Sequence, residues 1–378
     1  MMTQAPRLRG PVVIYGAGLL GTSIGLGLGH RGVPVLLSDP SPSALAIARD
    51  IGAGQPLSED PGVWPELVVV AAPPDVCAEV IADALERFPA AVVTDVSSVK
   101  SAILSRLQEL AEAKHREGGL LDLSRYLGSH PMAGRERSGA VSARGELFQA
   151  MPWVLCPHRT QSAASSPAAY ETVLNLAADL GAVAVKLGPE EHDAAVALVS
   201  HVPQVLSSLL AARLSGADAQ ALALAGNGLR DVTRIAASDP SMWVPVLDAN
   251  AGRIAAVLHE LHEDLLQLLT ALDQPAASGS RLAMAKTISA GNAGVARVPG
   301  KHGGPARAYT WVSVLVDDEP GQIAQLLTEI GEAGINVEDL RLDHSSGRNV
   351  GIVELSVLPD VREQLIEALT LRGWKVLQ

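Results

Sequence analysis

The segment VVIYGAGLLG, residues 12–21, decides the fold of this chain. A short β-rich run, Pro11–Tyr15, enters a glycine-rich turn that fits the pattern G-x-G-x-x-G, and a helical pattern follows over about Leu19–His30. Glycines let backbone approach a pyrophosphate, and the N-terminus of the following helix adds N–H donors and partial positive charge. The segment therefore predicts a dinucleotide-binding turn; a turn needed only for helix–strand packing is the alternative.

An acidic residue is expected about 20 residues after such a turn, and Asp39 stands there, after a second strand pattern over Val33–Ser38. Its carboxylate would accept hydrogen bonds from ribose hydroxyls and repel a 2′-phosphate, so NAD is predicted rather than NADP. The residues expected to bind NAD are Gly16, Gly18, Leu19, Leu20, Gly21, Asp39, Ala72 and Pro73. For the last two, simple termination of a strand is the alternative.

Strand and helix patterns alternate through the first part of the chain. Ser43–Ile51 and Val99–Glu112 have helical patterns, while Leu67–Ala72 and Ala91–Thr94 are apolar runs typical of strands buried on both faces. Alternation of this kind predicts an α/β, Rossmann-type doubly wound parallel sheet. We assign residues 1–188 to this dinucleotide-binding domain.

The rest of the chain changes pattern twice. Glu190–Leu272 is rich in Ala and Leu with few strand signals, which predicts an all-helical second domain over residues 189–295 that also suits a dimer interface. Residues 296–307 form a Gly- and Pro-rich linker. Residues 308–378 show the order βαββαβ, which is that of a ferredoxin-like α+β domain.

Bulk properties exclude several classes of function. The formal net charge of the 378 residues is −12, which argues against nucleic-acid binding, and the 2 cysteines, Cys77 and Cys156, argue against a disulfide framework or a cysteine metal cluster. No metal site is expected. The N-terminus has no apolar region of signal-peptide type, and Val12–Leu28 fits strand, turn and helix better than a membrane span. A cytoplasmic protein with no membrane partner is expected.

Four segments concentrate polar residues at the ends of apolar elements. They are DVSSVK (95–100), GSHPMAG (128–134), SHVPQ (200–204) and RDVTRIA (230–236), the last leading to SDPSMW (238–243). In this order behind the glycine turn, they closely resemble the prephenate/arogenate dehydrogenase family over about Val12–Leu272. The tail, with DEPGQ (318–322) before a helix and AGINV (333–337) after it, resembles an ACT domain.

The resemblance implies a reaction. Prephenate would undergo NAD-dependent oxidative decarboxylation to 4-hydroxyphenylpyruvate in tyrosine biosynthesis; the alternative substrate is arogenate, which gives tyrosine. A homodimer is implied, with an amino-acid effector such as tyrosine at the ACT domain. The effector residues would be Pro320, Gly321, Gly334 and Asn336.

The resemblance also implies catalytic residues. The family's catalytic histidine falls on His130, whose neutral imidazole would accept the proton of the substrate hydroxyl. Ser98 matches the family's serine and would bond to the same hydroxyl, to His130 or to the cofactor. The alternative for His130 is a buried structural histidine before Pro131.

The same resemblance implies substrate contacts. Arg234 would bind the ring carboxylate through a bidentate fork, the alternative being an ion pair with Asp231 or Asp239. His201 would lie near the substrate's side chain, with a core histidine as an equal alternative. The other implied contacts are Gln204, three residues further on; Arg135, where the family often has threonine, or else a solvated cation; and Trp243, or else a core residue.

Two other functions remain to be weighed. A β-hydroxyacid dehydrogenase shares the plan of a Rossmann domain plus helices, but that class generally needs a lysine in the helical domain, and Glu190–Leu272 has none. A non-catalytic amino-acid sensor would use the tail alone. Such a sensor would not need His130, Arg234 and Asp39 together.

Overall fold

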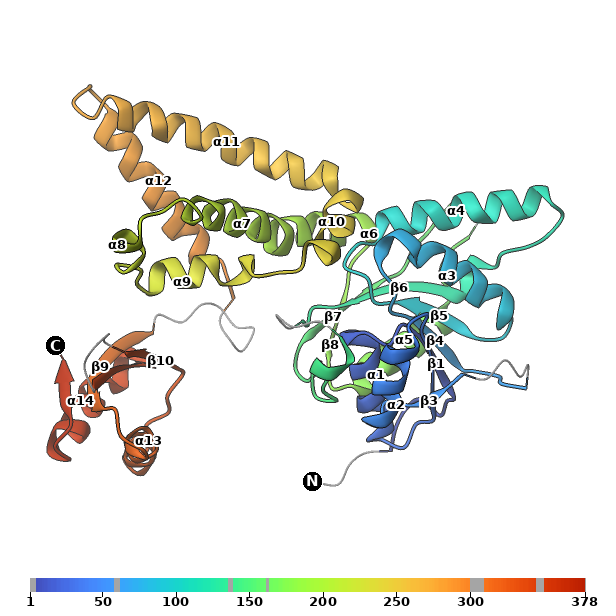
Figure 1. Ribbon diagram of the computed structural model, residues 1–378, viewed down its shortest axis with the longest axis horizontal. Coiled ribbons are helices and arrows are strands. Elements are labelled where there is room, and N and C mark those ends of the chain that lie inside the picture. The colour runs from blue at the N-terminus through green and yellow to red at the C-terminus, as the bar shows by residue number, and fades with distance from the viewer. Residues whose placement is uncertain are drawn as a thin grey trace. The chain divides into compact units, whose positions relative to one another are not determined.

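The computed structural model describes residues 5–57, 62–134, 139–160, 163–299, 309–344 and 350–377 (Figure 1). The chain divides into two compact units, Met1–Glu263 and Asp264–Gln378, and the division falls within one long helix, α11 (Ala251–Asp273).

The first unit is built on an eight-stranded sheet with the order β3-β2-β1-β4-β5-β6-β7-β8. Its strands are β1 (Val12–Tyr15), β2 (Val35–Ser38), β3 (Gln55–Pro56), β4 (Leu67–Val70), β5 (Val92–Asp95), β6 (Tyr126–Pro131), β7 (Pro152–Cys156) and β8 (Val183–Lys186). The Rossmann-type sheet expected from the sequence is thus present.

One pair of strands departs from the expected parallel arrangement. β6 and β7 are antiparallel, with His130 opposite Val154, whereas the other neighbouring pairs in this sheet are parallel. The described part of the connection between them holds only the short 3₁₀ turn η2 (Ala140–Ser142). A parallel return would need a crossover helix.

Helices cover both faces of the sheet (Figure 1). One face packs against α1 (Leu19–Gly29), α2 (Pro42–Asp50) and α5 (Pro167–Asp179), and the other against α3 (Pro74–Arg87) and α4 (Ser101–Arg116). Side chains alternate accordingly, since Val12 and Ile14 lie in the first core and Val13 lies in the second. A 3₁₀ turn, η1 (Leu123–Arg125), precedes β6.

The expected run of helices follows β8. It comprises α6 (Pro189–Val196), the π-helical turn η3 (Ala197–His201), α7 (Val202–Leu214), α8 (Ala219–Leu222), α9 (Asn227–Thr233), the 3₁₀ turn η4 (Arg234–Ala236), α10 (Pro240–Ala249), α11 and α12 (Ser280–Val295). Among the described residues, the continuous helical stretch Pro189–Leu214 is long and apolar enough to span a membrane. Its buried positions include the polar residues His192, Asp193 and His201, while leucines such as Leu206 and Leu209 are exposed.

The tail forms a separate four-stranded antiparallel sheet with the order β10-β11-β9-β12. Its elements are β9 (Thr310–Asp317), α13 (Gln322–Glu332), β10 (Asp339–His344), β11 (Val350–Val357), the 3₁₀ turn η5 (Pro359–Val361), α14 (Arg362–Leu371) and β12 (Lys375–Leu377). Alternate residues of β9, including Val312 and Val314, pack with Leu326 of α13 and Leu365 of α14. The expected order of strands and helices is confirmed.

Helix α1 offers a test of the packing. A Cβ on Gly25 would lie 2.2 Å from the carbonyl oxygen of Ala53, whereas a Cβ on Gly29 meets its nearest neighbour, the Gly52 oxygen, at 3.6 Å. We expect Gly25→Ala to lower the free energy of unfolding by about 1–3 kcal/mol through overpacking, while the control Gly29→Ala stays within about 0.5 kcal/mol of the wild type. Urea unfolding at fixed protein concentration measures both, and equal effects would contradict the close packing.

Candidate functional site

Four neighbouring parallel strands of the sheet end at one edge. β1 pairs with β4, β4 with β5, and β5 with β6. The carboxyl ends of these strands lead into the glycine turn, Pro73, Ser98 and His130 respectively. The topology therefore gathers at one edge the segments that sequence analysis assigned to cofactor binding and catalysis, which is where open α/β sheets bind ligands.

The three glycines of the turn meet different surroundings. A Cβ on Gly16, whose φ is +105°, would lie 2.3 Å from the carbonyl oxygen of Ala71, and a Cβ on Gly21 would lie 1.9 Å from that of Gly16. A Cβ on Gly18 would meet nothing within 4 Å. Gly16 and Gly21 are thus required by internal packing, and Gly18 leaves bare backbone at the start of α1, beside Leu19 and Leu20. This is a cradle of the kind that a pyrophosphate needs.

Asp39 is fixed against the turn. Its carboxylate accepts hydrogen bonds from the backbone N–H of Ala17 at 2.6 Å and of Ser41 at 2.7 Å. Each carboxylate oxygen retains a further lone pair that can accept a hydroxyl. The residues present therefore fit the ribose and pyrophosphate of a dinucleotide.

His130 stands near the end of β6 and is half-buried. Its Nδ1 lies 2.8 Å from Nε2 of His192 on α6, with the two rings edge to face. Burial is the main cause that lowers the pKa of His130 well below its usual range; His192, Lys100 and His201 lower it further, and Asp193 opposes them. The imidazole is therefore neutral near pH 7 and able to accept a proton.

Asp193 anchors the far side of His192. Its Oδ1 lies 2.8 Å from Nδ1 of His192, and its two oxygens accept the backbone N–H groups of Lys100 and Ser101 at 2.8 Å each. Burial raises the pKa of Asp193, but the hydrogen bonds from His192, Ser101 and Lys100 outweigh it and bring the pKa to about 2. The carboxylate is thus ionised and ties α6 to the N-terminus of α4.

A buried ion pair lies beneath the same loop. The Lys100 ammonium contacts the Asp95 carboxylate and donates to the carbonyl oxygen of Ser129 at 2.8 Å. Asp95 also accepts the hydroxyl of Tyr126 at 2.7 Å. These contacts hold the loop that carries Ser98, which is itself half-buried, against the strand that carries His130.

His201 and its neighbours form the next part of the site. The His201 ring is buried, with Nδ1 3.2 Å from Nδ2 of Asn250. Its ring centroid lies 6.1 Å from that of Trp243, with the two rings nearly perpendicular. Burial lowers the pKa of His201 to about 4. Gln204, one turn further along α7, reaches Ser238 at 3.5 Å. The His201 ring is therefore buried and neutral near pH 7, and it lies between Asn250 and Trp243.

Arg234 lies on η4, which packs against α7. Its side chain is exposed and makes an interaction within the chain. Its convergence with His130 stays a prediction. Arg135 lies outside the described residues.

Two family models match the chain. The prephenate dehydrogenase nucleotide-binding domain matches residues 24–186, and the prephenate dehydrogenase dimerization domain matches residues 188–285. The chain belongs to the prephenate dehydrogenase family.

Two named relatives match nearly the whole chain. The probable prephenate dehydrogenase NovF of Streptomyces niveus is 37% identical and covers 96% of this chain and 98% of its own length. The prephenate dehydrogenase of Bacillus subtilis is 25% identical, with coverages of 96% and 97%. A crystal structure of prephenate dehydrogenase from A. aeolicus, in complex with hydroxyphenyl propionate and NAD⁺, shares the fold with a TM-score of 0.63 at 23% identity, covering 75% of this chain and 97% of that one.

Two residues next to His130 were not among the site residues expected from the sequence. These are His192 and Asp193, which are both fully buried and bonded in series to His130. The available signal was a histidine next to an aspartate at the start of a helix whose later residues are mostly apolar. An ionisable pair there requires a buried partner, because unpaired charge is costly in a core.

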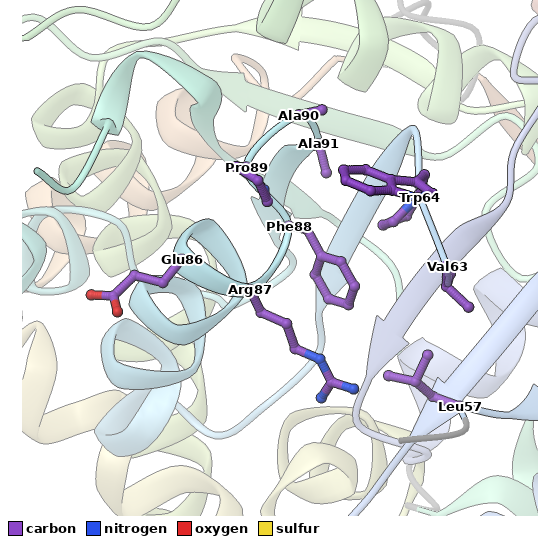
Figure 2. A pocket seen from close by; sticks show the side chains of 10 residues that line it. Leu57, Val63, Trp64, Glu86, Arg87, Phe88, Pro89, Ala90 and Ala91 are labelled. Carbon is purple, nitrogen blue, oxygen red and sulfur yellow. The ribbon is translucent and has the colours of Figure 1, made fainter. Parts of the chain in front are cut away.

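A separate hollow lies elsewhere on the sheet. Figure 2 shows Trp64, Arg87 and Phe88 around it. Its other lining residues are Leu57, Val63, Pro65, Glu86, Pro89, Ala90 and Ala91. Because these residues precede β4 and β5, the hollow faces the amino ends of the strands and is not part of the candidate site.

The predicted effector residues lie in the second unit, at both ends of α13. Pro320 and Gly321 precede the helix, and Gly334 and Asn336 follow it. All four are exposed, and Gly321 and Gly334 have φ of +95° and +71°. The Asn336 amide donates to Glu338 at 2.9 Å.

Proposed function

We propose that this chain is an NAD-dependent prephenate dehydrogenase that converts prephenate to 4-hydroxyphenylpyruvate in tyrosine biosynthesis. The observation that carries the proposal is the neutral, hydrogen-bonded imidazole of His130, which stands at the same edge of the sheet as the glycine turn. Membership of the family and the full-length similarity to named prephenate dehydrogenases support it.

His130 and Ser98 act on the C4 hydroxyl of prephenate. The hydroxyl proton passes to the imidazole of His130 as hydride leaves C4. The bond from C1 to the ring carboxylate then breaks to release carbon dioxide, and its electron pair makes the ring aromatic. The C4 oxygen regains the proton from His130 to give the phenol. Bound NAD⁺ supplies the acceptor for the hydride. Ser98 orients the hydroxyl. General-base assistance of this kind contributes roughly 10²–10⁴-fold to a rate.

The remaining polar groups bind the substrate. Arg234 pairs with the ring carboxylate, and Arg135 adds a second cation for the other carboxylate. His201, Gln204 and Trp243 enclose the side chain. The contact of His201 with Trp243, and the approach of Gln204 to Ser238 near Arg234, support their common assignment.

NAD binds along the carboxyl edge of the sheet. Gly16, Gly18 and Gly21, with Leu19 and Leu20, cradle the pyrophosphate. Asp39 binds the ribose hydroxyls, and Ala72 and Pro73 contact the nicotinamide half. The open space at Gly18 and the fixed carboxylate of Asp39 support this placement.

Residues 1–188 form the dinucleotide-binding domain and residues 189–295 the helical substrate and dimerisation domain of a cytoplasmic homodimer. The two family models, which match residues 24–186 and 188–285, support this division. Exposed leucines on α7 and α11 provide apolar surface for a partner subunit: Leu206, Leu209, Leu210, Leu261, Leu265, Leu266, Leu269 and Leu272.

Residues 296–307 link the enzyme to a ferredoxin-like ACT domain over residues 308–378, where tyrosine or a similar amino acid regulates it. The order βαββαβ and the exposed turns around α13 support this assignment. Pro320, Gly321, Gly334 and Asn336 bind the effector through backbone and amide groups.

The activity is tested by adding NAD⁺ with either prephenate or arogenate. We expect NADH and carbon dioxide in equal amounts with prephenate, and a lower kcat/KM with arogenate. His130→Asn should bind NAD⁺ with the same affinity but lose about 10²–10⁴-fold in kcat. His115→Asn, which changes an exposed histidine on α4, is the control. Near-normal turnover of the His130 variant would remove its proposed role.

The choice of cofactor is tested by Asp39→Ser. Loss of hydrogen bonds to a charged acceptor, each worth about 1.5–3 kcal/mol, should raise the KM for NAD⁺ by about tenfold or more. The ratio of kcat/KM for NADP⁺ to that for NAD⁺ should rise, because the charge that repels a 2′-phosphate is gone. Asp50→Ser, at the exposed end of α2, should change neither value.

The effector site is tested by assaying prephenate oxidation over a range of tyrosine concentrations. Tyrosine should inhibit the wild type, and Asn336→Ala should raise the half-inhibitory concentration about tenfold while leaving the uninhibited kcat unchanged, because one hydrogen bond to the charged effector is lost. Glu367→Gln, on the exposed side of α14, is the control. Unchanged inhibition of the Asn336 variant would place the effector elsewhere.

A further inference from the structure

Three side chains bond in series from the interior of α6 to β6. Oδ1 of Asp193 lies 2.8 Å from Nδ1 of His192, and Nε2 of His192 lies 2.8 Å from Nδ1 of His130. His192 and Asp193 are both 0% exposed, so water does not compete for these contacts. Because Nδ1 of His130 is used in the contact with His192, Nε2 is the ring nitrogen of His130 that is left to meet a substrate.

We propose that Asp193 and His192 are positioning residues that set the tautomer of His130 and so make its Nε2 the proton acceptor of the reaction. The inference rests on the proposed function for its chemical meaning, since His130 is the general base there. The inference predicts which ring nitrogens carry hydrogens in the free protein, so this part of it does not depend on the proposed activity.

The direction of each hydrogen bond follows from Asp193. An ionised carboxylate only accepts hydrogen bonds, so Nδ1 of His192 carries a hydrogen and donates it. In a neutral His192 ring, Nε2 then holds a lone pair and accepts a hydrogen from Nδ1 of His130. In a neutral His130 ring, Nε2 is in turn left without a hydrogen. If His192 were an imidazolium, the second bond would reverse and His130 would present an N–H to the substrate.

The surroundings hold this arrangement in place. The carboxylate of Asp193 accepts two backbone N–H groups at the N-terminus of α4, where the helix dipole favours negative charge. The backbone oxygen of Asp193 accepts the amide of Asn250 at 2.8 Å, which fixes α6 from its other side. A carboxylate with so many donors keeps its charge and cannot rotate freely.

Charge near His130 favours the neutral ring before reaction. The Lys100 ammonium opposes a proton on His130, and the Asp193 carboxylate favours one. The Lys100 ammonium is itself paired with Asp95. When His130 Nε2 takes the hydroxyl proton, its positive charge is shared through His192 toward the fixed carboxylate, so Asp193 stabilises the product of proton transfer without touching the substrate.

The tautomer can be measured without substrate. Nitrogen chemical shifts of protein labelled with ¹⁵N-histidine distinguish a ring protonated at Nδ1 from one protonated at Nε2, and the signals of His130 are those that vanish in His130→Asn. We expect the Nδ1–H form for His130 and for His192 in the wild type near pH 7. A wild-type His130 in the Nε2–H form would overturn the inference, whatever the enzyme's activity.

Two variants extend the test to the reaction. Asp193→Asn and His192→Ala should change the tautomer signals of His130 and lower kcat by about 10-fold or more, with the KM values for prephenate and NAD⁺ within about threefold. Glu191→Gln removes a neighbouring carboxylate of α6 that caps Gly188 outside this series, and it should retain both tautomer and kcat. In Asp193→Asn the acidic limb of the pH profile of kcat should move to lower pH, because a carboxylate that favours the charged imidazole is lost.

The outcomes separate the two proposals. No turnover of prephenate by the wild type, with the Nδ1–H form at His130, would refute the proposed function alone. Normal turnover with unchanged kcat and pH profile in Asp193→Asn would refute the relay alone. A fall in kcat by one factor at every pH, with the tautomer unchanged, would assign Asp193 a purely structural role and also refute the relay.

Discussion

The buried carboxylate of Asp193 is the contact on which the candidate site depends. It joins three parts of the chain that are distant in sequence: α6, which carries it, the N-terminus of α4, whose N–H groups it accepts, and β6, which it reaches through His192. An ion in such a position must be satisfied on every side, because desolvation costs several kcal/mol. These directional hydrogen bonds fix the start of α4 against α6.

A second buried charge supports the same loop from below. Lys100 and Asp95 are 1% and 0% exposed, and both have further partners in Ser129 and Tyr126. Removing one member of such a pair typically costs about 3–5 kcal/mol, since the other is left unpaired. The segment DVSSVK is therefore a structural support as well as the source of the serine proposed for catalysis. Asp95 and Lys100 are buried, and Ser98 is half-buried.

The sheet determines where these parts meet. Parallel strands all end at the same edge, so a turn after β1, a loop after β5 and a histidine at the end of β6 become neighbours without any specific sequence connection between them. Strand β7 pairs antiparallel with β6 next to His130. The helical segment that starts at Pro189 then brings His192 into hydrogen-bond contact with His130. Rigid strands and a helix hold the imidazole, which suits a base that must meet one hydroxyl.

The sequence by itself determined the local elements and their order. The buried strands are apolar runs, and the helices have a repeating apolar pattern. The turn at Gly16 contains glycines at positions where a side chain has no room. Each of these features is encoded within a short stretch of sequence. Gly16, Asp39 and His130 could be proposed from sequence, because their motifs lie within such stretches or resemble a family. The antiparallel pairing of β7 and the series Asp193–His192–His130 were decided only by the tertiary structure. The first depends on pairing between strands, and the second on a contact between His130 and His192, which are 62 residues apart in sequence. No local sequence pattern distinguishes a solvent-exposed histidine at the start of a helix from one whose ring is buried against a second histidine.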